Sequence, residues 1–158
     1  MNADSKSKEK ELSENELLKK EIELLKNEIK YLKDNCIFKT KIETLYPKDL
    51  LTEGEKLNDY IRISKGQWQF GPYRHYEPGK YLIVYEGDGF LNGNFDIIDN
   101  GLKPPDISFS VIFKSQNFFR YEVIIPENLI SGIEFRCNCQ KDATRIIIKK
   151  IEVYKYNI

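Results

Sequence analysis

The chain of 158 residues holds 25 Lys and Arg against 25 Asp and Glu, with one His and three Cys. This length suits one ordinary domain and an appendage, and the even charge disfavours a nucleic-acid partner, which selects for a basic excess. Because no secretory leader and no run of about 18 apolar residues is present, we expect a cytoplasmic protein with no membrane span.

The N-terminal segment divides into a tail and a helix. Residues 1–10 are polar and mostly charged, and we expect them to be disordered. Residues 11–36 carry a seven-residue apolar repeat, with leucine at d and isoleucine at two of the a positions, which predicts a coiled coil. In this register every g-to-e′ pair between two parallel helices places a Glu opposite a Lys, the charge pattern that pairs parallel helices.

We therefore predict a homodimer through this helix. The predicted interface consists of Asn15, Leu18, Ile22, Leu25, Ile29, Leu32 and Cys36. The repeat is short, and Leu17, Leu24 and Tyr31 form a second apolar stripe. A trimer, or a monomeric helix docked on its own domain, is therefore an alternative.

From residue 37 the apolar period changes from seven to two, which predicts strands. Turn residues separate eight β-rich runs, at 37–45, 59–66, 80–87, 93–99, 107–113, 119–126, 132–139 and 145–156. No helical pattern alternates with these runs. We predict a mainly β fold, an antiparallel two-sheet β-sandwich of the jelly-roll kind over residues 37–158.

Several strands indicate which side chains face the core. Both faces of the run at 80–87 are apolar, which predicts a central strand. The last run changes phase at residues 149–150, which predicts a β-bulge. Cys137 and Cys139 alternate onto an apolar face, and we interpret them as small buried hydrophobes rather than metal ligands. In the run at 107–113 one buried face is predicted to consist of Ile107, Phe109, Val111 and Phe113.

Aromatic residues are concentrated in the segment 66–81, "GQWQFGPYRHYEPGKY". We predict a largely exposed loop between the second and third strands, since Gly-Pro and Pro-Gly mark turns. Rings and planar polar groups suit sugar binding, although for Trp68 alone, which lies beside a turn, core packing is the favoured interpretation. The candidate ligand-binding residues are Gln67, Trp68, Gln69, Tyr73, Arg74, His75 and Tyr76.

The order of several short motifs resembles a known group of domains. "GPY" at 71–73, "EPGKYLIVYEG" at 77–87, "YEVIIP" at 121–126, "GIEFRC" at 132–137 and "IIIKKIEVYK" at 146–155 follow one another. This order resembles the carbohydrate-binding-module-like sandwiches attached to bacterial surface-polysaccharide enzymes. The resemblance covers residues 60–156 and implies a non-catalytic, glycan-associated domain that works beside glycosyltransferases, methyltransferases or polysaccharide exporters.

We expect a non-enzymatic accessory protein of polysaccharide biosynthesis, in which a homodimer pairs two carbohydrate-binding sites. The alternative is a structural scaffold or assembly subunit that binds protein partners and has no sugar site. We find no nucleophile elbow, P-loop or Cys-His-Asn set. We expect no cofactor and no metal, because turn-forming side chains explain the Asx-rich run at 88–101 more simply than a calcium site.

Overall fold

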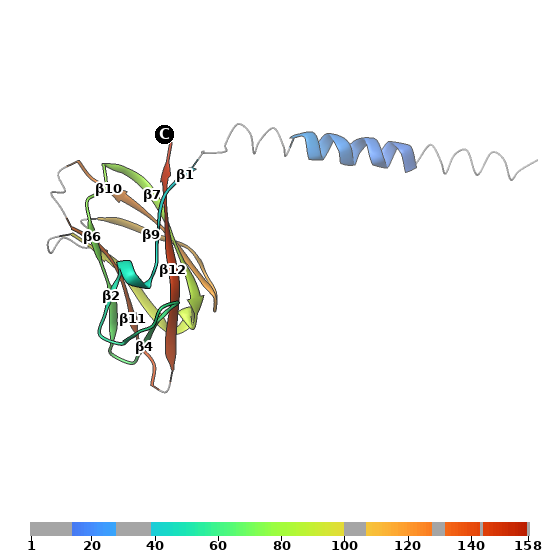
Figure 1. The fold of residues 1–158 in the computed structure, drawn as a ribbon. Coiled ribbons are helices and arrows are strands. Elements are labelled where there is room, and N and C mark those ends of the chain that lie inside the picture. The colour runs from blue at the N-terminus through green and yellow to red at the C-terminus, as the bar shows by residue number, and fades with distance from the viewer. Residues whose placement is uncertain (1–13, 28–38, 100–106, 128–131, 143, 158) are drawn as a thin grey trace, which may run out of the picture. The chain divides into compact units, whose positions relative to one another are not determined.

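The computed structural model describes residues 14–27, 39–99, 107–127, 132–142 and 144–157, which belong to two units that divide after residue 37. In the first unit, residues 14–27 are helical. The predicted tail at 1–10 and the second half of the predicted coiled coil lie outside the described residues. The second unit is mainly β and consists of two antiparallel sheets (Figure 1).

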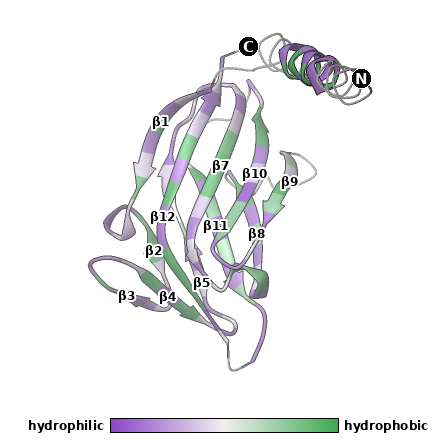
Figure 2. Cartoon of the chain, turned by 90° about the vertical axis from the view of Figure 1, so that its right-hand side faces the viewer, coloured by the Kyte–Doolittle hydropathy of each residue, from purple (hydrophilic) through white to green (hydrophobic). Residues whose placement is uncertain are grey.

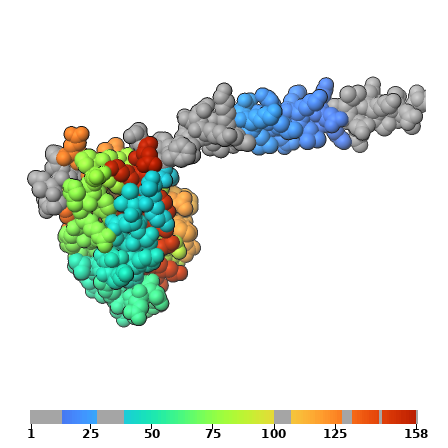
Figure 3. All heavy atoms as spheres, turned by 45° about the horizontal axis from the view of Figure 1, so that its top comes forward, coloured from blue at the N-terminus to red at the C-terminus, as the bar shows by residue number. Residues whose placement is uncertain are grey.

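The larger sheet has seven strands in the described part of the chain. Its order is β3 (Glu55–Lys56), β4 (Ile61–Ser64), β12 (Arg145–Tyr156), β7 (Gly79–Asp88), β10 (Phe118–Ile125) and β9 (Ser108–Lys114), with β1 (Lys39–Leu45) also paired to β12. The pairing of β1 with β12 is antiparallel, and in the space-filling view atoms of the two segments lie side by side (Figure 3).

The smaller sheet is arranged around β11. It contains β2 (Leu51–Thr52), β5 (Trp68–Phe70), β6 (Pro72–Arg74), β8 (Gly93–Ile98) and β11 (Ile133–Cys139). Strand β8 pairs with one edge of β11, while β5 and β6 share the other edge. Two short 3-10 helices, η1 (Pro47–Asp49) and η2 (Phe90–Asn92), connect strands.

The eight predicted strands are confirmed, and four short ones were missed. β2, β3, β5 and β6 hold two or three residues each, which is too few for a period of two to be recognised. The predicted loop at 66–81 is therefore wrong in part, because β5 and β6 lie within it.

Hydrophobic and hydrophilic residues alternate along the strands (Figure 2). The hydrophobic faces of the two sheets therefore pack against each other and form one core. β7 is central as predicted, since it lies between β12 and β10. The predicted bulge in β12 is confirmed by a register shift between Ile148 and Lys150. Cys137 and Cys139 are fully buried, as predicted. The core therefore follows from the pattern of these central strands.

The predicted buried face of β9 is wrong at two positions. Ile107 is buried and Phe109 is half-buried, but Val111 and Phe113 are 52% and 48% exposed. β9 lies at the end of the sheet order, so fewer neighbours cover it. Its register against β10 also shifts between Val111 and Phe113, which turns Phe113 to the opposite face.

Candidate functional site

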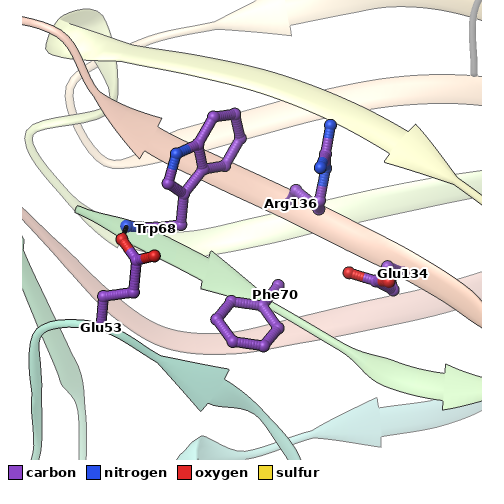
Figure 4. Close-up of a pocket in the computed structure, with 5 residues that line it drawn as sticks. All are labelled: Glu53, Trp68, Phe70, Glu134 and Arg136. Atoms are coloured by element: carbon purple, nitrogen blue, oxygen red, sulfur yellow. Dashed lines mark hydrogen bonds between the residues drawn. The ribbon is translucent and has the colours of Figure 1, made fainter. Parts of the chain in front are cut away.

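The outer face of the five-stranded sheet carries the candidate site. On β5 the side chain of Gln69 is fully buried between the sheets. Because side chains alternate along a strand, its neighbours Trp68 and Phe70 project from the outer face, where both are half-buried. Figure 4 shows these two rings with side chains from β11 beside them. The result is an aromatic surface on the outer face of a β-sheet.

An ion pair orients the polar groups beside the indole. Arg136 on β11 and Asp96 on β8 are directly opposite each other. Arg136 Nε and Nη2 donate to the two carboxylate oxygens of Asp96 at 2.6 and 2.5 Å. The guanidinium carbon lies 4.8 Å from the centroid of the Trp68 ring, within range of a cation–π contact. The hydrogen bonds to Asp96 raise the pKa of Arg136, so the pair holds a fixed set of donors.

Two further carboxylates complete a hollow of about 240 Å³, which is lined by Glu53, Trp68, Phe70, Glu134 and Arg136 (Figure 4). Glu53 lies just after β2, and its Oε2 accepts a hydrogen bond from the Trp68 backbone N–H at 3.1 Å. Glu134 precedes Arg136 by two residues on β11 and therefore shares its face. Burial raises the pKa of Glu134, and the positive charge of Arg136 offsets part of this rise.

Tyr73 on β6 extends the row of rings. Its ring centroid lies 6.4 Å from that of Phe70, and the two planes are at 83°. The Tyr73 backbone has a φ of 61°, which is uncommon for a residue other than glycine. Its side chain is 50% exposed, and burial together with the neighbouring Glu134 raises the pKa of its hydroxyl. Trp68, Phe70 and Tyr73 thus offer ring surface in one region of the sheet.

Only part of the predicted ligand set lies at this hollow. Trp68 lines it, Tyr73 adjoins it through Phe70, and Gln67 donates from Nε2 to the backbone oxygen of Glu53 at 3.2 Å. The Gln67 side chain therefore holds the turn that carries Glu53 by a hydrogen bond. These three predicted residues lie in one region with residues from β11.

The other four predicted residues lie elsewhere. The predicted exposure of Gln69 and Tyr76 is wrong, because they are 0% and 6% exposed. Gln69 points inward by strand alternation, and the Tyr76 hydroxyl donates to Glu43 while its ring packs in the core. Arg74 is exposed and pairs with Glu43. His75 is exposed.

Sequence reasoning missed most of the polar residues of the hollow. Phe70 lay within the aromatic segment but was not selected, and Glu53, Asp96, Glu134 and Arg136 lie far from it in sequence. One signal was present for β11. Since Cys137 and Cys139 were predicted to face inward, Glu134 and Arg136 had to face outward.

The predicted interface residues that are described lie on an exposed helix. Asn15, Leu18, Ile22 and Leu25 are helical and exposed, with exposures of 55%, 46% and 53% for the three apolar residues in chain order. Ile29, Leu32 and Cys36 lie outside the described residues. The helix therefore presents apolar side chains that a partner helix would cover, and the homodimer stays a prediction.

Within the described ranges, no group of three or more His, Cys, Asp or Glu side chains is placed to hold a metal ion. No helix among these residues is long and apolar enough to cross a bilayer. In comparisons with known proteins, no family model and no curated protein matches the chain.

Proposed function

We propose that this protein is a non-catalytic glycan-binding protein, an accessory to polysaccharide-processing enzymes, in which a coiled coil pairs two jelly-roll-like sandwiches. The observation that carries the proposal is the shallow hollow where aromatic rings lie beside oriented polar groups. The faces of pyranose rings stack on aromatic side chains, and their hydroxyls need donors and acceptors at fixed positions. Trp68 and Phe70 supply ring surface, while Arg136 and Glu134 supply donors and an acceptor.

Rigidity of the hollow supports binding. Trp68, Phe70, Glu134 and Arg136 project from paired strands of one sheet, and bonds to Asp96 hold the guanidinium. A ligand therefore meets groups that are already in place, which lowers the entropic cost of binding. An open hollow of about 240 Å³ holds a small part of a polymer, so we expect each site to be weak.

Pairing of two chains compensates for weak single sites. The heptad repeat predicts a parallel dimer, and the described half of it exposes its apolar positions Leu18, Ile22 and Leu25. Linking two sites on one polymer raises avidity by about 10² to 10⁴-fold when the geometry permits both to bind. A dimer therefore suits a repetitive glycan.

A glycan array tests the proposal. We expect the wild-type chain to bind at least one polysaccharide and the Trp68→Ala and Phe70→Ala variants to lose that binding. Phe113→Ala is the matched control, because this exposed ring lies on β9 of the other sheet. Circular dichroism of each variant checks that the sandwich folds. Absence of wild-type binding to every glycan at high protein concentration would refute the function.

A second candidate function, assembly with protein partners, is favoured by a different observation. The edge strand β9 exposes three consecutive apolar side chains, with Val111, Ile112 and Phe113 at 52%, 53% and 48% exposure. Exposed edges of this kind add strands from other chains. If this function holds, Phe113→Ala weakens partner capture in a pull-down and Trp68→Ala does not.

A further inference from the structure

Carboxylates dominate the charge of the hollow on the five-stranded sheet. Glu53 and Glu134 line it, and Arg136 is the one cationic residue among its lining side chains. Arg136 is itself bound by Asp96. With Asp96 included, the site holds three carboxylates and one guanidinium, so a bound sugar meets an excess of negative charge.

The positive charge of Arg136 is largely committed. Two of its five N–H donors bond to Asp96, and one face of the guanidinium lies over the Trp68 ring. The remaining donors can still bond to hydroxyl oxygens. They offer an incoming anion little net attraction, because the Asp96 carboxylate cancels the charge at close range.

Glu134 adds a reason why an anion is disfavoured. Its side chain is half-buried, and burial already raises its pKa. A second negative charge brought close to this carboxylate increases the cost of keeping it ionised, whereas an ammonium group lowers that cost. The same electrostatic preference applies at Glu53, which is exposed and more strongly screened by water.

We infer that the site discriminates by charge: it takes glycans that carry a free amine most tightly, uncharged glycans next, and uronate- or phosphate-bearing glycans least. This inference rests on the proposed function and names the ligand class of the same site. A neutral sugar uses the rings and hydroxyl contacts alone. An amino sugar adds an ion pair with Glu134 or Glu53, and a uronate adds repulsion from both.

The experiment uses immobilised oligosaccharides in matched trios, and each trio holds the neutral, the free-amine and the uronate form of one hexose. One trio is built on glucose, one on galactose and one on mannose, and the affinity of the full chain for each member is measured at low and at high salt. We expect affinities to fall by about tenfold from the neutral to the uronate member at low salt. The difference should shrink at high salt, because salt screens exposed charges.

Variants assign the discrimination to the hollow. In the Glu53→Gln, Glu134→Gln double variant, the affinity for the uronate should lie within about twofold of the same variant's affinity for the neutral sugar, whatever the change in neutral affinity itself. Glu86→Gln is the control, since Glu86 lies on β7 of the other sheet and its removal changes net charge in the same way as one of the two substitutions. This control should leave the ranking unchanged.

The outcomes separate the two claims. Either of two wild-type results would overturn the charge rule and leave glycan binding intact: a uronate that binds as tightly as its neutral counterpart or more tightly, or a free-amine sugar that binds no more tightly than it. Persistence of the ranking in the double Gln variant would overturn the assignment to these carboxylates. Failure of every trio and of the wider array to bind would refute the glycan function itself, and the charge rule with it.

Discussion

Replacement of the buried Gln69 by leucine should destabilise the sandwich by about 1–5 kcal/mol. Gln69 Nε2 donates to the Phe135 carbonyl at 3.0 Å, and the Tyr85 hydroxyl donates to Gln69 Oε1 at 3.2 Å. Both side chains are fully buried. Gln69→Leu leaves two buried polar groups without this partner, at about 1–3 kcal/mol each, and the apolar burial of leucine offsets about 1 kcal/mol.

Urea unfolding at one fixed protein concentration measures this loss, with fluorescence of Trp68, the single tryptophan, as the reporter. Tyr85→Phe alone and the Gln69→Leu, Tyr85→Phe double variant complete a cycle. Because the two side chains share a hydrogen bond, the double variant should lose about 1 kcal/mol less than the sum of the single losses. A change below about 0.5 kcal/mol in Gln69→Leu, or strictly additive losses, would refute the cross-sheet bond.

Three further substitutions test other parts of the molecule. The Tyr121 hydroxyl is buried with no hydrogen-bond partner among the described residues, so Tyr121→Phe should raise the free energy of unfolding by about 1 kcal/mol; a decrease in urea unfolding would reveal a partner. Bonds led by the one from Lys41 lower the pKa of Glu152 from 4.5 to about 2. The stability that this carboxylate contributes is present above pH 4.5 and is lost as pH falls towards 2. The free energy of unfolding should therefore fall by about 2 kcal/mol less over this pH range in Glu152→Gln than in the wild type, as measured by unfolding at a series of pH values. Ile22→Pro should halve the mass measured by light scattering, and equal masses would exclude the coiled-coil dimer.

The long strands could be predicted because apolar residues recur along them with a period of two. β7, β11 and β12 hold 10, 7 and 12 residues, and the apolar pattern in each recurs several times. The short strands β5 and β6 hold three residues each. A segment of that length acquires its strand geometry from β11, with which it pairs, and that partner is distant in sequence.

The candidate site was only half predictable for the same reason. Trp68 and Tyr73 were found because rings cluster in one segment, yet Tyr76 of that cluster fills the core. Arg136 and Asp96 reach Trp68 only through the pairing of three strands. The composition of a segment shows which chemistry is available. The register between strands decides which groups meet.

The adjacency of β1 and β12 has a practical consequence for engineering. Lys39 and Tyr156 are opposite each other in the ladder, so the polypeptide arrives at the sandwich and departs from it through neighbouring points. A short linker would close the sandwich into a ring, and new termini could then be opened at a surface turn. By the same geometry, the sandwich could be inserted whole into a loop of a host enzyme without pulling that loop apart.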